Sequence, residues 1–106
     1  MNVTDIAKKI IKEEIEKSGF NVVQIILFGS RAKGDFNKES DWDFLVVVDK
    51  EINRNLKRKF FENISIKLAQ SNILNDIIIK SIKDISEQKD DKGYLAYYAI
   101  RDGILI

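Results

Sequence analysis

Two apolar runs rich in β-branched residues constrain the fold of this chain more than any other feature of its sequence. They span Val22–Phe28 and Trp42–Val48, and a polar segment from Gly29 to Glu39 connects them. Short apolar runs bounded by polar turn residues are typical of buried strands. We therefore predict two strands at these positions, with one helical turn in the polar connection.

Apolar residues at helical spacing precede and follow this pair of strands. Residues Val3–Lys17 carry the first such pattern, and Ser18-Gly19 is a suitable end for the helix. A second amphipathic helix, capped near Asn53, is predicted from a four-residue repeat. The residues of that repeat are Ile52, Leu56, Phe60, Ile64 and Leu68.

The C-terminal part of the chain is less regular. We predict a third strand over Ile73–Ile79, a charged loop over Glu87–Gly93, a short helix over Tyr94–Ile100 and an edge strand over Ile104–Ile106. The aromatic residues of the short helix would also suit a strand. This order of elements indicates a single α/β domain over residues 1–106, with a small mixed β-sheet and helices packed on it.

Composition excludes several kinds of chemistry. The 106 residues include no cysteine and no histidine, which excludes thiolate nucleophiles, cysteine-ligated zinc and histidine-containing triads. The formal charge of +1 gives no reason to expect direct binding of nucleic acid. The apolar runs are far shorter than the roughly 20 residues of a membrane span. The N-terminus lacks the layout of a signal peptide, so we expect a cytoplasmic protein without membrane contact.

A glycine-serine turn follows the first predicted strand. Free backbone N–H groups at a helix start bind anionic oxygen, and glycine permits close approach of a ligand. The Ser30 hydroxyl and the Arg31 guanidinium would add donors, and Ser30 is expected to cap a short helix that begins at Arg31. An ordinary strand-to-helix turn would have the same pattern. A Walker P-loop is excluded, because Asp35-Phe36 occupies the positions that require Lys and then Ser or Thr.

Two carboxylates open the second predicted strand. Asp41 and Asp43 are two positions apart, so on a strand they point to the same face, with origins roughly 6–7 Å apart. Such carboxylates can jointly bind two divalent ions about 3.5–4 Å apart, and oxygen ligands suit Mg²⁺ or Mn²⁺. The alternative is a surface strand that merely begins with acidic residues. The glycine-serine turn before it favours the metal site.

Asp76 is the candidate for a third carboxylate. It interrupts the apolar strand predicted over Ile73–Ile79, where an unpaired charge is costly. We therefore predict that Asp76 is a metal ligand or the base that accepts a proton from an attacking hydroxyl. Solvent exposure at the start of the strand, beside Asn75, would explain it without any function.

The segment Phe28–Val48, with its Gly-Ser turn and its pair of aspartates, resembles the signature of the DNA polymerase β-type nucleotidyltransferase superfamily. The chain is most similar to the minimal nucleotidyltransferases, in particular the antitoxin partners of HEPN-domain toxins. This resemblance implies a nucleotidyltransferase fold. The site residues that it implies are metal ligands at Asp41, Asp43 and Asp76, and phosphate contacts at Gly29, Ser30 and Arg31.

The resemblance also implies an activity and a partner. The chain would transfer a nucleoside monophosphate, AMP from ATP, to a hydroxyl, with two Mg²⁺ ions (or Mn²⁺) as cofactors. The implied acceptor is a tyrosine of a HEPN-domain toxin, which the modification would silence, so the chain would act as an antitoxin. We expect the acceptor surface to come from a partner protein or from self-association.

Other functions stay open at this point. A non-catalytic nucleotide-binding module would neutralise a partner by steric masking. A small-molecule or nucleic-acid nucleotidyltransferase would use a different acceptor. An RNA-binding module could use the basic residues Arg54, Lys57, Arg58 and Lys59, although such a cluster is more often a solvated helix face.

Overall fold

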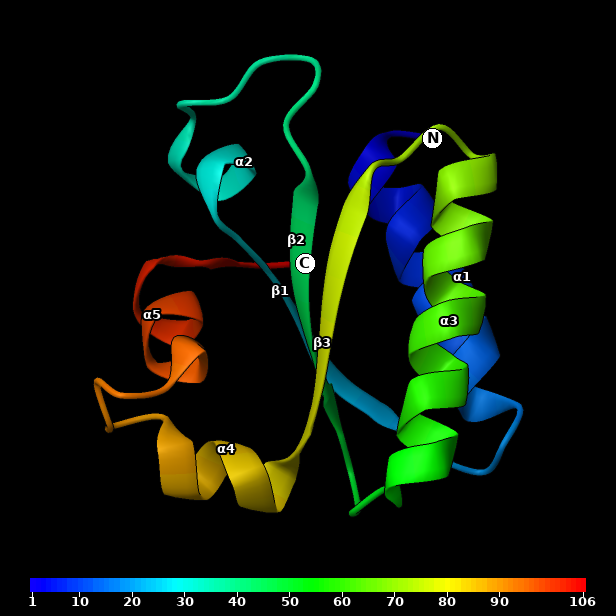
Figure 1. The fold of residues 1–106 in the computed structure, drawn as a ribbon, viewed down its shortest axis with the longest axis vertical. Helices are drawn as coiled ribbons and strands as arrows, with labels where there is room; N and C mark the ends of the chain where they lie inside the picture. The colour runs from blue at the N-terminus through cyan, green and yellow to red at the C-terminus, as the bar shows by residue number, and fades with distance from the viewer.

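A four-stranded mixed sheet with helices on both faces forms the protein (Figure 1), described by a computed structural model over residues 1–106. This architecture confirms the predicted α/β class and small mixed sheet. None of the helices has the length and apolar content that a membrane span requires. The elements in chain order are α1 (Val3–Glu16), β1 (Val22–Phe28), α2 (Ser30–Lys33), β2 (Trp42–Val48), α3 (Arg54–Gln70), β3 (Asn75–Ser81), α4 (Ile82–Gln88), α5 (Leu95–Asp102) and β4 (Ile104–Leu105).

The strand order across the sheet is β3-β2-β1-β4. Strand β1 is antiparallel to both of its neighbours, β2 and β4, whereas β2 and β3 are parallel and α3 connects them. The end of β1 and the starts of β2 and β3 therefore meet at the same end of the sheet. Polar residues at these three strand ends are brought together by topology alone.

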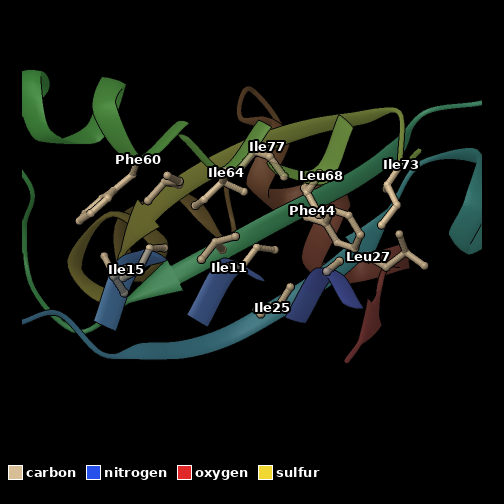
Figure 2. Close-up of a cluster of buried hydrophobic side chains, with 14 residues drawn as sticks. Ile11, Ile15, Ile25, Leu27, Phe44, Phe60, Ile64, Leu68, Ile73 and Ile77 are labelled. Atoms are coloured by element: carbon tan, nitrogen blue, oxygen red, sulfur yellow. The ribbon is translucent and has the colours of Figure 1, made fainter. Parts of the chain in front are cut away.

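Helices α1 and α3 cover one face of the sheet and enclose the main hydrophobic core. Figure 2 shows side chains of both helices, among them Ile11 and Ile64, packed against Phe44 and Ile77 of the sheet. A smaller cluster joins α5 to the opposite face through Ile26, Leu45, Val47, Ala96 and Ala99. Strand β2 is thus buried on both faces, which explains why its apolar residues form a continuous run rather than an alternating pattern.

One carboxylate is buried between the two helices of the main layer. Glu14 of α1 is 1% exposed and pairs with Lys67 of α3 and with Lys17, whose Nζ lies 2.9 Å from Oε2 of Glu14. Hydrogen bonding to Lys67, and then to Lys17, holds the pKa of Glu14 below its usual range. The ion pair therefore ties α1 to α3 above the sheet.

The structure corrects two predictions in the C-terminal part. Strand β3 begins at Asn75 rather than Ile73 and continues to Ser81, and α4 follows it where no helix was predicted. A capping box starts α4: the Ser81 hydroxyl accepts a hydrogen bond from the Asp84 N–H, and the Asp84 carboxylate accepts one from the Ser81 N–H. This pair satisfies two N–H groups at the helix start, which is the local reason that the helix forms.

Candidate active site

The predicted site residues gather where β1 ends and where β2 and β3 begin. In the sheet register, Asp43 lies opposite Phe28 on one side and beside Asp76 on the other. Adjacent strands are about 4.8 Å apart, so the backbones of Asp43 and Asp76 are direct neighbours. Figure 1 shows α2 and the connection to β2 at this end of the sheet, clear of α4. The topology therefore brings together the turn and two of the three predicted carboxylates.

Negative charge without a compensating cation dominates the electrostatics at this end of the sheet. Burial raises the pKa of Asp43, and repulsion by Asp76 and then by Asp41 raises it further. Asp41 and Asp76 are exposed, and none of the three aspartates forms an ion pair within the protein. A cation bound at this edge would relieve the repulsion, because an opposite charge favours the ionised form of a carboxylate.

Gly29 is in direct contact with the site through the side chain of Asp43. A methyl group added at Gly29 would overlap Oδ2 of Asp43 and lie 3.1 Å from its Cγ. Its φ of +73° also favours glycine. We predicted that the missing side chain makes room for a phosphate; the structure shows instead that Asp43 occupies that room.

Ser30 is the first residue of α2 and not its cap. The residue at the cap position is Gly29, and no side-chain hydrogen bond caps this helix, so the predicted capping role of Ser30 is wrong. Instead, the Gly29 carbonyl accepts hydrogen bonds from the N–H groups of Ala32 and Lys33, both at 3.1 Å. No group of the protein hydrogen-bonds the Ser30 hydroxyl, which leaves it free to donate to a ligand.

Arg31 has partners within its own loop. Its guanidinium lies 4.5 Å from the ring centroid of Phe36 and 4.5 Å from that of Trp42. Its Nε and Nη2 donate to the Ser40 carbonyl at 3.2 and 3.0 Å. The side chain that we predicted as a phosphate contact thus joins α2 to the start of β2. This arrangement favours positioning of the acidic residues over direct contact with a ligand.

The donor set at this edge fits Mg²⁺ in its chemistry, since all of its ligands are oxygen. Asp43 and Asp76 are neighbours, whereas Asp41 lies in the connection before β2. No three acidic side chains converge into a complete cation site. None of the three aspartates lines one of the main cavities of the structure.

Comparison with known proteins gives this geometry a family context. Residues 7–100 match the family described as nucleotidyltransferase domain. The protein adenylyltransferase MntA of Aphanizomenon flos-aquae is 39% identical over 82 residues, which cover 74% of this chain and 52% of MntA. The chain therefore spans about half the length of this curated relative.

Two solved structures have the same fold. A toxin-antitoxin crystal structure with AMP-PNP superposes with a TM-score of 0.65 at 17% identity, over 99% of this chain and 72% of that chain. A mutant of the toxin-antitoxin MntA-HpeT gives a TM-score of 0.62 at 18% identity, over 100% of this chain and 72% of that chain. These matches confirm the predicted nucleotidyltransferase fold.

Proposed function

The chain belongs to the nucleotidyltransferase domain family, and on that premise we propose that it transfers AMP from ATP to a hydroxyl of a partner protein. The acceptor that we propose is a tyrosine of a HEPN-domain toxin, so the chain would act as an antitoxin. One observation supports this proposal above the others. The carboxylate of Asp43 lies against Gly29 of the Gly29-Ser30 turn, and Asp43 is the register neighbour of Asp76.

The acidic residues would hold the metal ions of the reaction. We expect Asp43 and Asp76 to bind metal together, because they are neighbours in the sheet register. Asp41, in the connection before β2, would be the third metal ligand. Bound Mg²⁺ supplies charge neutralisation for the phosphates and lowers the pKa of an acceptor hydroxyl. Asp76, exposed at the start of β3, could alternatively accept the proton of that hydroxyl.

The turn would hold the triphosphate. The free hydroxyl of Ser30 can donate to a phosphate oxygen, and the carboxylate of Asp43 lies directly beside Gly29, so phosphate and metal ligands would be neighbours at this turn. Arg31 would act indirectly, since it fixes Ser40 immediately before Asp41. In this arrangement the positions of the nucleotide and of the carboxylates depend on the same short loop.

The test is transfer of label from α-labelled ATP to the protein encoded by the neighbouring gene, in the presence of Mg²⁺. We expect label on a tyrosine of that protein, and loss of labelling in Asp43→Asn. The matched control is Asp90→Asn, which removes an exposed carboxylate in the loop after α4 and should label normally. Absence of labelling, or equal labelling by Asp43→Asn, would contradict the proposal.

A second candidate function is steric masking of the partner without catalysis. One observation favours this function: no three acidic side chains converge at the end of the sheet that carries the aspartates. This function predicts that the partner is inhibited equally with and without ATP and Mg²⁺. Inhibition that requires both ATP and Mg²⁺ would exclude it.

A further inference from the structure

We infer that the open edge of β3 is a docking site for an acidic, extended segment of a partner protein, which joins the sheet as an additional strand. This inference does not rest on nucleotidyl transfer. The docking surface lies C-terminal to Asp76 on β3, and residues of β3 and α3 form it together. We name this surface the β3 edge groove and define it by Arg54, Lys57, Arg58, Phe61 and the strand residues 77–80.

The groove follows the unpaired side of the strand. Strand β3 is the outermost strand of the sheet and pairs with β2 alone. The groove has a volume of about 360 Å³ and is lined by four consecutive residues, Ile77 to Lys80, whose side chains alternate between the two faces of the sheet. A cavity lined in this way runs along the strand edge, where backbone groups are available to another strand.

The charge of the groove is entirely positive. Its cations are Arg54, Lys57, Arg58 and Lys80; no carboxylate lines it, and none of the four forms an ion pair within the protein. Burial lowers the pKa of Lys57, and the charge of Lys80 lowers it further. An adjoining cavity that shares Lys57 and Lys80 contains Glu51 and Asp84, so acidic groups limit the positive surface at that end.

Apolar side chains supply the rest of the lining. Phe61 is 41% exposed although it is a large aromatic residue, and Ile78 is half-buried. Ile78 points to the face opposite α3, whereas Arg54, Lys57 and Arg58 belong to α3. An added strand presents alternate side chains to opposite faces, so it can place apolar residues beside Ile78 on one face and carboxylates near the cations of α3 on the other. The groove therefore fits an extended segment in which acidic and apolar residues alternate.

Two other occupants fit these observations less well. A second copy of the chain would bring its own Arg54, Arg58 and Lys80 against the same cations, and like charges at close range oppose that contact. RNA would be attracted by the cations but would use neither the strand edge nor the apolar lining. Lys59, the fourth residue of the basic cluster singled out in the sequence, borders a different cavity.

The experiment measures binding of a fluorescein-labelled heptapeptide of alternating glutamate and valine to the full chain, without ATP or Mg²⁺. We expect saturable binding that weakens about tenfold in the double variant Arg54→Glu/Arg58→Glu, which corresponds to about 1.4 kcal/mol. The control variant Lys8→Glu/Lys9→Glu has the same net charge, changes exposed residues of α1, and should bind like the wild type. Hydrogen exchange of the wild type should show slower exchange at residues 77–80 when the peptide is bound.

Several outcomes would overturn the inference. Equal weakening in both double variants would mean that net charge, not the groove, attracts the peptide. Unchanged exchange at residues 77–80 would exclude strand addition, and this measurement needs no variant to fold. Tighter binding of a short oligouridylate, or dimers that the Arg54→Glu/Arg58→Glu variant abolishes, would assign the groove to RNA or to a second copy. Because none of these assays measures transfer, they succeed or fail independently of the proposed activity.

Discussion

Gly29 and Asp43 face each other across the junction where β1 ends and β2 begins, with the carboxylate of Asp43 in the space that a side chain at Gly29 would fill. The two residues belong to different halves of the sequence pattern, the turn and the acidic pair. In the structure they form one unit, because any residue larger than glycine at the turn displaces the carboxylate. The antiparallel pairing of β1 with β2 is thus what brings the turn and the acidic pair together.

Gly29→Ala should therefore impair both stability and transfer. We expect a loss of about 1–2 kcal/mol in the free energy of unfolding, since alanine at position 29 would be held at a positive φ and its methyl group would push Asp43 aside. Urea denaturation would measure this loss. Gly34→Ala is the matched control, because Gly34 has a φ of +87° but no atom within 4 Å of an added methyl. Only Gly29→Ala should reduce labelling of the partner, by tenfold or more; equal reduction by both variants would contradict the argument.

Asp43→Asn should stabilise the protein while it abolishes transfer. Because the pKa of Asp43 is raised in the folded state, the folded protein binds more protons than the unfolded chain between the two pKa values. The stability of the wild type therefore falls as pH rises through that window, and the ionised carboxylate is unfavourable at pH 7. We expect the melting temperature of the variant at pH 7 to lie a few degrees above that of the wild type.

The same variant tests whether a cation binds at this edge. Mg²⁺ that binds only the folded protein should raise the melting temperature of the wild type, and Asp43→Asn should remove most of that increase. Asp90→Asn should respond to Mg²⁺ as the wild type does. A melting temperature of the wild type that is unaffected by Mg²⁺ would count against a metal site.

Arg31→Lys should separate positioning from phosphate contact. Lysine keeps the charge, but it lacks the planar guanidinium that lies over the rings of Phe36 and Trp42 while donating twice to the Ser40 carbonyl. If Arg31 positions the loop before Asp41, kcat for partner labelling should fall about tenfold with the KM for ATP changed less than about twofold. A rise in KM with kcat unchanged would instead assign Arg31 to the triphosphate.

The sequence was sufficient to predict two of the three strands that carry the site, β1 and β2, but not the bounds of β3. Both β1 and β2 have the predicted bounds, because β-branched runs between polar turns specify a buried strand. The position of Asp43 beside Asp76 could not be predicted from the sequence pattern alone. It requires β2 and β3 to be parallel neighbours in one particular register, and register depends on how α3 packs across the sheet.

The helix α4 and the contacts of Arg31 were not predicted from the sequence, and both depend on particular side-chain contacts. The capping box of α4 has a recognisable Ser-x-x-Asp pattern at Ser81 and Asp84, which could have indicated the helix that was not predicted. The partners of Arg31 have no such signal. Phe36 lies within the connection and Trp42 at the start of β2, and only the folded path of the chain brings both ring centroids to 4.5 Å from the Arg31 guanidinium.

Lys67→Ala should reveal how much the buried carboxylate of Glu14 contributes. Since hydrogen bonding to Lys67 lowers the pKa of Glu14, its contribution is present above the unfolded pKa and is lost as pH falls through the folded value. We expect Lys67→Ala to lose about 2 kcal/mol at pH 7, because Glu14 would keep only its pair with Lys17. The loss should shrink as the pH is lowered and Glu14 becomes protonated. Urea denaturation at pH 7 and at a series of lower pH values measures this change, with the exposed Lys59→Ala on the same helix as control. A loss that does not change with pH would mean that Lys67 stabilises the protein without the charge of Glu14.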